Sequence, residues 1–254
     1  MELNKIYNED CLDTMKRMPN DFVDMTLTSP PYDNLRDYKG YSFDFESIAK
    51  ELFRITKQGG VVVWIVGDAT INGNESGTSF KQVLFFKECG FNLHDTMIWH
   101  KLNPMPYIKH NCYTPSFEYM FIFSKSVPKA TNICVEESKY AGKILKTFTR
   151  NPESIRKQNI NNPTKDTKLK SNVWGIVLAG TNHGHPAIFP EKLAIDHIKS
   201  WSNEEDLIYD PMMGSGTTGK AAVMLKRNYI GSEISSEYCK IAEARIKSIS
   251  NPLF

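Results

Sequence analysis

Hydrophobic positions along the chain alternate between short continuous runs and runs spaced three or four residues apart. The continuous runs predict strands and the spaced runs predict helices. Strands are predicted at Val23–Thr28, Val61–Val66, Thr96–Trp99, Glu118–Ser124, Asp206–Asp210 and Tyr229–Ser232, and helices at Phe45–Thr56, Phe80–Cys89, Pro190–Ser200, Thr217–Leu225 and Ser236–Ile249. Alternating strands and helices indicate an α/β fold with a largely parallel, doubly wound sheet. Its ligand site is expected at the carboxyl ends of the strands.

The alternation stops between Ser126 and Asn172, where Asn, Lys, Thr and Pro accumulate. Because 254 residues can bury one sizeable core, we expect one catalytic domain, 1–124 and 173–254, with an insertion at 125–172. The insertion carries eleven Lys or Arg residues and four acidic ones, a net charge of +7, which leaves −5 for the rest of a chain whose total is +2. Such a patch suits a polyanionic partner, and a solvated lysine-rich loop is the alternative interpretation.

Composition is that of a soluble globular protein, with 41% hydrophobic and 24% charged residues and no repeats. The five cysteines form no C-x-x-C pair, which favours free thiols over disulfides or a zinc site. Residues 1–10 are charged where a signal peptide needs an apolar core, and the run Val61–Val66 is too short to span a bilayer. We therefore expect a soluble, cytoplasmic protein.

A glycine-rich segment, Asp210–Thr218, lies between a predicted strand and a predicted helix. A turn of this kind lets a ligand approach the backbone closely. The segment lacks the Gly-Lys-Ser/Thr ending of a P-loop and the full three-glycine dinucleotide fingerprint. Glu233 ends the next strand, where nucleoside-binding sheets place the acid that holds the ribose hydroxyls. The pattern favours an adenosine-type ligand without a pyrophosphate, and a structural glycine turn is the alternative.

A second motif, Thr28-Ser29-Pro30-Pro31-Tyr32, also follows a predicted strand. It offers a hydroxyl, a carbonyl held by proline and an aromatic face. A base taken out of a DNA duplex needs hydrogen bonds to its polar edge and a ring on which to stack. Taken alone, such a string is more often a simple turn.

Together the two motifs resemble the DNA methyltransferases that modify exocyclic amino groups. The catalytic motif precedes the glycine loop, an order similar to the beta class, which implies a circularly permuted, Rossmann-like S-adenosylmethionine-dependent methyltransferase fold. The resemblance extends to Asn8–Leu12, Gly231–Glu233 and His185–Leu193. It implies catalytic roles for Ser29, Pro30, Pro31 and Tyr32, and S-adenosylmethionine binding by Asp10, Cys11, Thr28, His185, Pro186, Phe189, Asp210, Pro211, Met212, Gly214, Ser215, Gly216, Thr217 and Glu233, with no metal expected.

The chemistry that the resemblance implies is direct displacement at the cofactor's methyl group. Ser29 and the Pro30 carbonyl would accept hydrogen bonds from the amine, and Tyr32 would stack on the flipped base. In this family Ser before Pro-Pro-Tyr is most often linked to cytosine N4, whereas Asp there is typical of adenine N6. We therefore expect N4 methylation of cytosine in double-stranded DNA, with adenine N6 as the alternative. Methylation at carbon 5 is disfavoured, because no cysteine follows the two prolines.

Other classes remain as alternatives: an RNA or protein-amide methyltransferase, or a nucleic-acid-binding module without catalysis. His183 and His185 lack further clustered ligands, which disfavours a metal site. The basic insertion is the candidate for target recognition. Partners expected beyond DNA are a separately encoded restriction endonuclease, as in restriction-modification systems, and a second copy of the chain in a homodimer.

Overall fold

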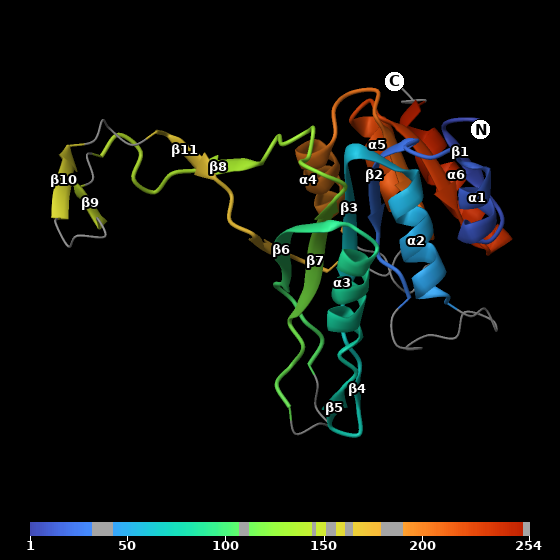
Figure 1. The fold of residues 1–254 in the computed structure, drawn as a ribbon, viewed down its shortest axis with the longest axis horizontal. Coiled ribbons are helices and arrows are strands. Elements are labelled where there is room, and N and C mark those ends of the chain that lie inside the picture. Colours follow the sequence, from blue (N-terminus) through green and yellow to red (C-terminus); the bar gives the residue numbers. More distant parts are fainter. Residues whose placement is uncertain are drawn as a thin grey trace. The chain divides into compact units, whose positions relative to one another are not determined.

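The computed structural model describes residues 1–31, 43–106, 112–143, 146–150, 156–160, 165–178 and 190–250 (Figure 1). The chain divides into two compact units. The main unit comprises Met1–Asn132 and Asn172–Phe254, and the second unit comprises Ile133–Ser171.

An eight-stranded sheet forms the centre of the main unit, in the order β1-β14-β13-β2-β3-β7-β6-β12. In sequence order its strands are β1 (Lys5–Tyr7), β2 (Val23–Thr28), β3 (Thr56–Val66), β6 (Asn92–Lys101), β7 (Phe117–Ser124), β12 (Val173–Ile176), β13 (Leu207–Asp210) and β14 (Asn228–Ser232). The pairings are parallel except those of β7, which runs antiparallel to both neighbours. The predicted, largely parallel α/β fold is confirmed.

Helices cover both faces of this sheet. They are α1 (Cys11–Arg17), α2 (Phe45–Ile55), α3 (Thr78–Glu88), α4 (Glu191–Trp201), α5 (Thr217–Met224) and α6 (Ser236–Ser250). Along β3 the side chains alternate: Val61, Val63 and Ile65 join a core cluster with α4, α5 and α6, whereas Val62, Trp64 and Val66 join a cluster with α1, α2 and α3. A strand buried on both faces reads as a continuous apolar run, which is why β3 could be predicted from sequence.

The second unit is built from two small antiparallel pairs. β8 (Val135–Glu137) pairs with β11 (Thr167–Leu169), and β9 (Lys146–Arg150) pairs with β10 (Arg156–Ile160). It lies within the insertion predicted at 125–172, but residues 125–132 belong to the main unit. There Lys125 is buried, and its Nζ donates to Asp21 Oδ1 at 2.9 Å and to the Phe53 carbonyl at 2.9 Å.

A short hairpin, β4 (Thr70–Ile71) and β5 (Asn74–Glu75), extends the chain beyond the carboxyl end of β3 (Figure 1). Asn72 and Gly73 form its turn, and both have the positive φ that two-residue hairpin turns with an Asn-Gly sequence require. Asp68 fixes the base of the hairpin, since its Oδ1 accepts hydrogen bonds from the Ser79 amide at 2.9 Å and the Ser76 hydroxyl at 3.1 Å.

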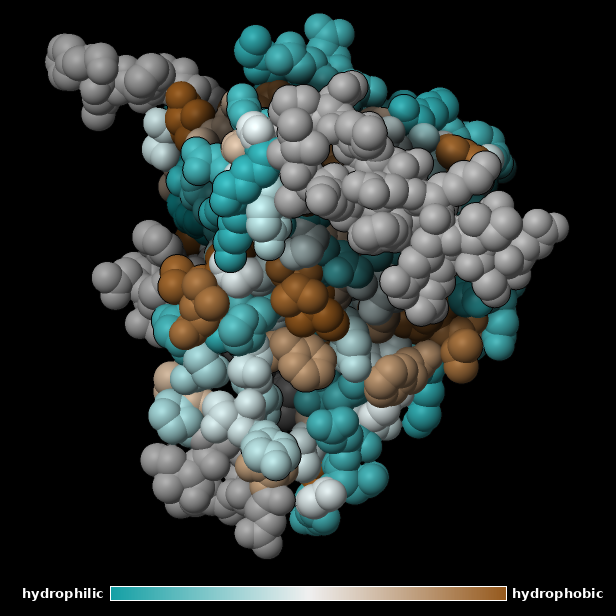
Figure 2. Space-filling view, turned by 90° about the vertical axis from the view of Figure 1, so that its left-hand side faces the viewer, coloured by the Kyte–Doolittle hydropathy of each residue, from teal (hydrophilic) through white to brown (hydrophobic). Residues whose placement is uncertain are grey.

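The surface mixes hydrophilic and hydrophobic residues. On the face shown in Figure 2, hydrophobic residues form separate patches between hydrophilic ones. At the β12 edge of the sheet Leu102, Val173 and Val177 are exposed. Within the described ranges, none of the helices has the length and apolar character needed to cross a membrane.

Candidate active site

Four parallel strands, β1, β14, β13 and β2, end at one edge of the sheet and bring the two predicted motifs together. Their registers pair Tyr7 with Ser232, Asp210 with Gly231 and Tyr209 with Thr26. The glycine-rich loop after β13 is therefore flanked by the residues that follow β14 on one side and by the segment after β2 on the other. This is the edge at which ligands bind in open α/β sheets.

The glycine loop is a tight turn that leads into α5. Gly214 and Gly216 have φ of 50° and 83°, left-handed values that suit glycine. The Gly216 amide donates to the Met213 carbonyl at 2.9 Å, and the Met213 amide donates to the Ser232 carbonyl at 2.9 Å. A Cβ on Gly216 would lie 2.7 Å from the Ala242 Cβ, so α6 packs directly against the loop backbone. A side chain at Gly216 would push the loop away from α6.

Asp210 is buried at the end of β13, and this burial raises the pKa of its carboxyl to about 6. Hydrogen bonds oppose the shift: the Thr218 hydroxyl donates to Oδ2 at 2.6 Å, and the Met212 amide donates to Oδ1 at 3.0 Å. Asp210 is thus a buried carboxyl that takes up a proton near pH 6, well above its ordinary range, and is largely ionised at neutral pH.

This pKa predicts a pH-dependent stability difference between the wild type and Asp210→Asn. The ordinary pKa is 3.8 and the folded value is about 6, so the folded state holds the proton more tightly. The contribution of Asp210 to the free energy of unfolding therefore falls as pH rises from about 4 to 6, by roughly 3 kcal/mol in full. Urea unfolding from pH 4.5 to 8 should show the variant gaining stability relative to wild type as pH rises. A constant difference across that range would contradict the assignment.

Glu233 is buried directly after β14. Its Oε2 accepts a hydrogen bond from the Gly214 amide at 2.8 Å, and its Oε1 accepts one from the Ser235 amide at 2.8 Å. Burial raises the pKa of the Glu233 carboxyl, and these amide hydrogen bonds lower it. The Asn8 side chain donates to the Glu233 carbonyl at 2.8 Å, which ties the end of β1 to the end of β14. The predicted ribose-binding acid thus also supports the glycine loop.

The second motif begins at the adjacent strand end. Thr28 and Pro30 are buried, and Ser29 and Pro31 are half-buried at the edge. Tyr32 lies outside the described residues. A direct contact links this motif to the glycine loop, because the Thr218 hydroxyl lies 3.4 Å from the Leu27 carbonyl as well as bonding to Asp210. Thr218 was not among the predicted site residues, since its bridging position depends on how α5 packs against β2.

The N-terminal segment of the predicted site is partly structural. Asp10 is exposed and caps α1, because its Oδ1 accepts a hydrogen bond from the Leu12 amide at 2.7 Å. Cys11 is buried, and burial raises the pKa of its thiol to about 12. A thiol with this pKa stays protonated at neutral pH and is a poor nucleophile.

Part of the predicted cofactor segment lies outside the described residues, namely His185, Pro186 and Phe189. The structure resumes at Pro190, which is buried and precedes α4. Glu191, the first residue of α4, forms an ion pair of 2.6 Å with Lys220 of α5, so the end of that segment is joined to the helix that follows the glycine loop. His183 is also outside the described ranges, and within them no three His, Cys, Asp or Glu residues cluster as metal ligands would.

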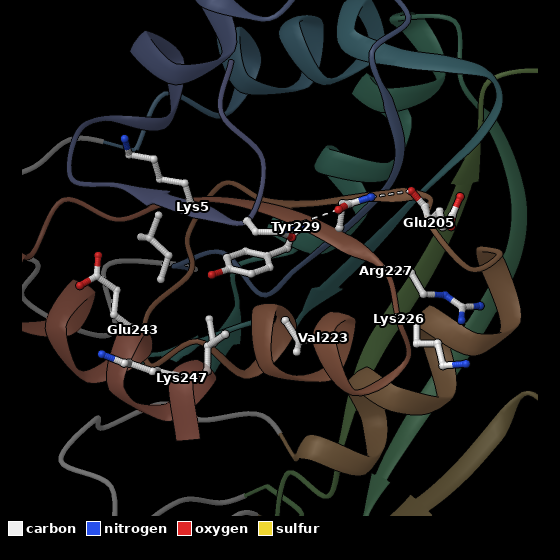
Figure 3. A pocket seen from close by; sticks show the side chains of 12 residues that line it. Lys5, Glu205, Val223, Lys226, Arg227, Tyr229, Glu243 and Lys247 are labelled. Atoms are coloured by element: carbon white, nitrogen blue, oxygen red, sulfur yellow. Dashed lines mark hydrogen bonds between the residues drawn. The ribbon is translucent and has the colours of Figure 1, made fainter. Parts of the chain in front are cut away.

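A groove of about 740 Å³ lies at the opposite edge of the sheet, where β1, β13 and β14 begin (Figure 3). Its lining mixes both signs of charge: Lys5, Lys226, Arg227 and Lys247 stand with Glu205 and Glu243 around Tyr229. The groove is separate from the glycine loop, Glu233 and Thr28–Pro31, which lie at the carboxyl edge.

Comparisons with known proteins support the predicted family. The model of the N6/N4 DNA methylase family matches residues 23–244. The chain is 52% identical over 240 residues to the orphan methyltransferase M.BamHII of Bacillus amyloliquefaciens, with 89% of each protein covered. Its fold is similar to that of the PvuII cytosine-N4-specific DNA methyltransferase, with a TM-score of 0.72, 22% identity, and 95% and 85% of the two chains covered. It is also similar to the M1.HpyAVI complex with S-adenosylmethionine, with a TM-score of 0.65, 24% identity, and 95% and 98% covered.

The carboxyl edge has features that fit S-adenosylmethionine. The cofactor is cationic at its sulfonium and its ammonium group, and two buried carboxyls, Asp210 and Glu233, lie at this edge. The loop between them carries no side chain at Gly214 or Gly216 that would fill the space above the strands. The chain belongs to the N6/N4 DNA methylase family and is a DNA methyltransferase that uses S-adenosylmethionine.

Proposed function

We propose that this enzyme methylates N4 of cytosine in double-stranded DNA, at a site formed by the glycine loop and the Ser29–Tyr32 motif. The observation that carries the proposal is the junction of the two motifs: β2 and β13 are adjacent, and Thr218 contacts both. The presence of Ser29, rather than Asp, before Pro-Pro-Tyr favours cytosine. The fold is also similar to that of a methyltransferase named as specific for cytosine N4.

In this proposal the residues at the ends of three strands hold the cofactor. Glu233 would bind the ribose hydroxyls, Asp10 would contact the adenine, and the glycine loop would let the nucleoside approach the backbone closely. The remaining predicted cofactor residues are Cys11, Thr28, His185, Pro186, Phe189, Asp210, Pro211, Met212, Ser215 and Thr217. When bound, S-adenosylmethionine supplies an electrophilic methyl group on a sulfonium.

The catalytic segment acts on the amine by positioning and hydrogen bonding. An exocyclic amine conjugated with its ring is a weak nucleophile. Ser29 Oγ and the Pro30 carbonyl would each accept a hydrogen bond from the N–H groups of the amine, which would reduce conjugation and orient the nitrogen for attack on the methyl group. Tyr32 stacks on the flipped base. Pro30 is buried, and the following Pro31 restricts its ψ to extended values, so its carbonyl is held in place before the base arrives.

We assign target recognition to the second unit, within the predicted insertion. Its described lysines include Lys139, Lys143, Lys165 and Lys168, all exposed, and Lys168 pairs with Glu136 at 2.9 Å. Exposed lysines provide affinity for phosphates, whereas base contacts provide specificity. A restriction endonuclease and a homodimer stay predictions, and the relative at 52% identity is named an orphan methyltransferase.

Nucleoside analysis tests the proposal. Unmethylated genomic DNA is incubated with the enzyme and S-adenosylmethionine that carries a deuterated methyl group, digested to nucleosides and analysed by mass spectrometry. We expect deuterated N4-methylcytosine. Deuterated N6-methyladenine would retain the displacement chemistry but refute the base assignment, and 5-methylcytosine would refute the mechanism as well.

A further inference from the structure

A guanidinium group lies behind the glycine loop. Arg245, in the third turn of α6, donates from Nη1 to the Ser215 carbonyl at 2.5 Å and to the Ser215 hydroxyl at 2.7 Å. Ser215 is buried and Arg245 is half-buried. Burial lowers the pKa of Arg245, and the nearby Glu191 carboxylate raises it. A charged donor in such a site makes stronger hydrogen bonds than one in water.

These contacts complete a set that holds the loop from two sides. From β14, the Ser232 carbonyl accepts the Met213 amide and Glu233 accepts the Gly214 amide. From α6, Arg245 holds the Ser215 carbonyl. The peptide between Ser215 and Gly216 is held at its amide by the Met213 carbonyl and at its carbonyl by Arg245, and glycine itself resists rotation of this peptide little because it adopts both signs of φ. Arg245 is therefore in a position to fix the orientation of this peptide.

That orientation matters for a ligand at the carboxyl edge. A carbonyl directed toward α6 keeps its partial negative charge away from the ligand side of the loop. If the peptide turned over, the carbonyl oxygen would face the N-terminal end of α5, where amide hydrogens favour anionic groups. The methionine part of S-adenosylmethionine ends in a carboxylate, which a carbonyl oxygen in that place would repel.

We propose that Arg245 is a positioning residue for S-adenosylmethionine: it touches no ligand and sets the conformation of the loop that does. The inference rests on the part of the proposed function that places the cofactor at the glycine loop. It is independent of the base that receives the methyl group. Arg245 would therefore control cofactor affinity, with little effect on the transfer step once the cofactor is bound.

A second arginine provides a matched control. Arg227 is also half-buried, and burial also lowers its pKa. It donates to the Leu225 carbonyl at 2.5 Å and to the Ser202 carbonyl at 2.7 Å, near the amino edge of the sheet. Both arginines thus hold backbone carbonyls through similar contacts, but only Arg245 holds the glycine loop. Loss of Arg227 should lower thermal stability without changing cofactor affinity.

The test is calorimetric titration of S-adenosylmethionine into wild type, Arg245→Met, Arg245→Lys and Arg227→Met, in the absence of DNA, with the melting temperature of each. We expect Kd to rise about thirtyfold in Arg245→Met and about fivefold in Arg245→Lys, and to stay within about twofold of wild type in Arg227→Met. At saturating cofactor, kcat of Arg245→Lys should stay within about twofold of wild type.

Wild-type affinity in the Arg245 variants would overturn the proposal. An equal loss of affinity in Arg227→Met would overturn it too, since general destabilisation would then explain the effect. If Arg245→Met does not fold, Arg245→Lys decides, because it keeps the charge and loses the planar geometry. Because the titration contains no DNA, a wrong base assignment leaves its outcome unchanged, and failure of the Arg245 proposal leaves the base assignment unchanged.

Discussion

Replacing Gly216 with alanine is expected to lower the free energy of unfolding by at least about 3 kcal/mol and to weaken S-adenosylmethionine binding by roughly a hundredfold. Two causes add. The φ of 83° is left-handed, and the new Cβ would lie 2.7 Å from the Ala242 Cβ and 2.9 Å from its Cα. Backbone atoms of α6 cannot move aside as a flexible side chain could, so the loop must shift. Urea unfolding and calorimetric titration measure the two effects.

Gly73→Ala is the matched control for this prediction. Gly73 has a nearly identical φ of 78°, but a Cβ there meets no atom within 4 Å. It should cost only about 1 kcal/mol and leave cofactor affinity unchanged. If the two variants lost similar stability, conformational strain alone would account for Gly216, and the close packing of α6 against the loop would have no energetic role.

Ser29→Ala is expected to lower kcat by roughly a hundredfold while the Kd for S-adenosylmethionine stays within about twofold of wild type. The variant removes one of the two acceptors that would direct the exocyclic amine, but it leaves the glycine loop and both buried carboxyls intact. Single-turnover methylation of DNA with a radiolabelled methyl group measures the transfer step, and titration without DNA measures cofactor binding.

Ser124→Ala serves as the control serine, because Ser124 is buried at the opposite end of the sheet, at the end of β7. It should methylate DNA at the wild-type rate. A wild-type rate in Ser29→Ala would remove Ser29 from the catalytic motif. A large rise in the Kd for the cofactor would instead make Ser29 part of the cofactor site.

Sequence alone predicted the main elements of the core and the edge at which the motifs meet. The prediction worked because β3 is apolar on both faces and because the predicted helices have three-to-four residue spacing. It did not give the direction of β7, since an apolar strand pattern is the same read forwards or backwards. The seven-residue helix α1 was also not predicted, because its segment was interpreted only through its resemblance to a family motif.

Contacts that depend on how the elements pack could not be predicted from the sequence. In the sequence, Arg245 is an ordinary charged residue on a terminal helix. Its contact with the glycine loop is visible only in the folded structure, where α6 packs against that loop. Thr218 follows a predicted site residue, but its contact with Leu27 requires the pairing of β2 with β13. The strands of the second unit are short and lie in a polar segment without regular alternation, so no periodic signal marked them.

A crystal structure of the protein with S-adenosylmethionine would show which of two separate places receives the ligand. We expect the cofactor at the carboxyl edge, with its ribose hydroxyls on Glu233 and its methyl group facing Ser29 and Pro30. A cofactor bound in the groove around Tyr229, or bound at the carboxyl edge with its methyl group directed away from Ser29, would contradict this expectation.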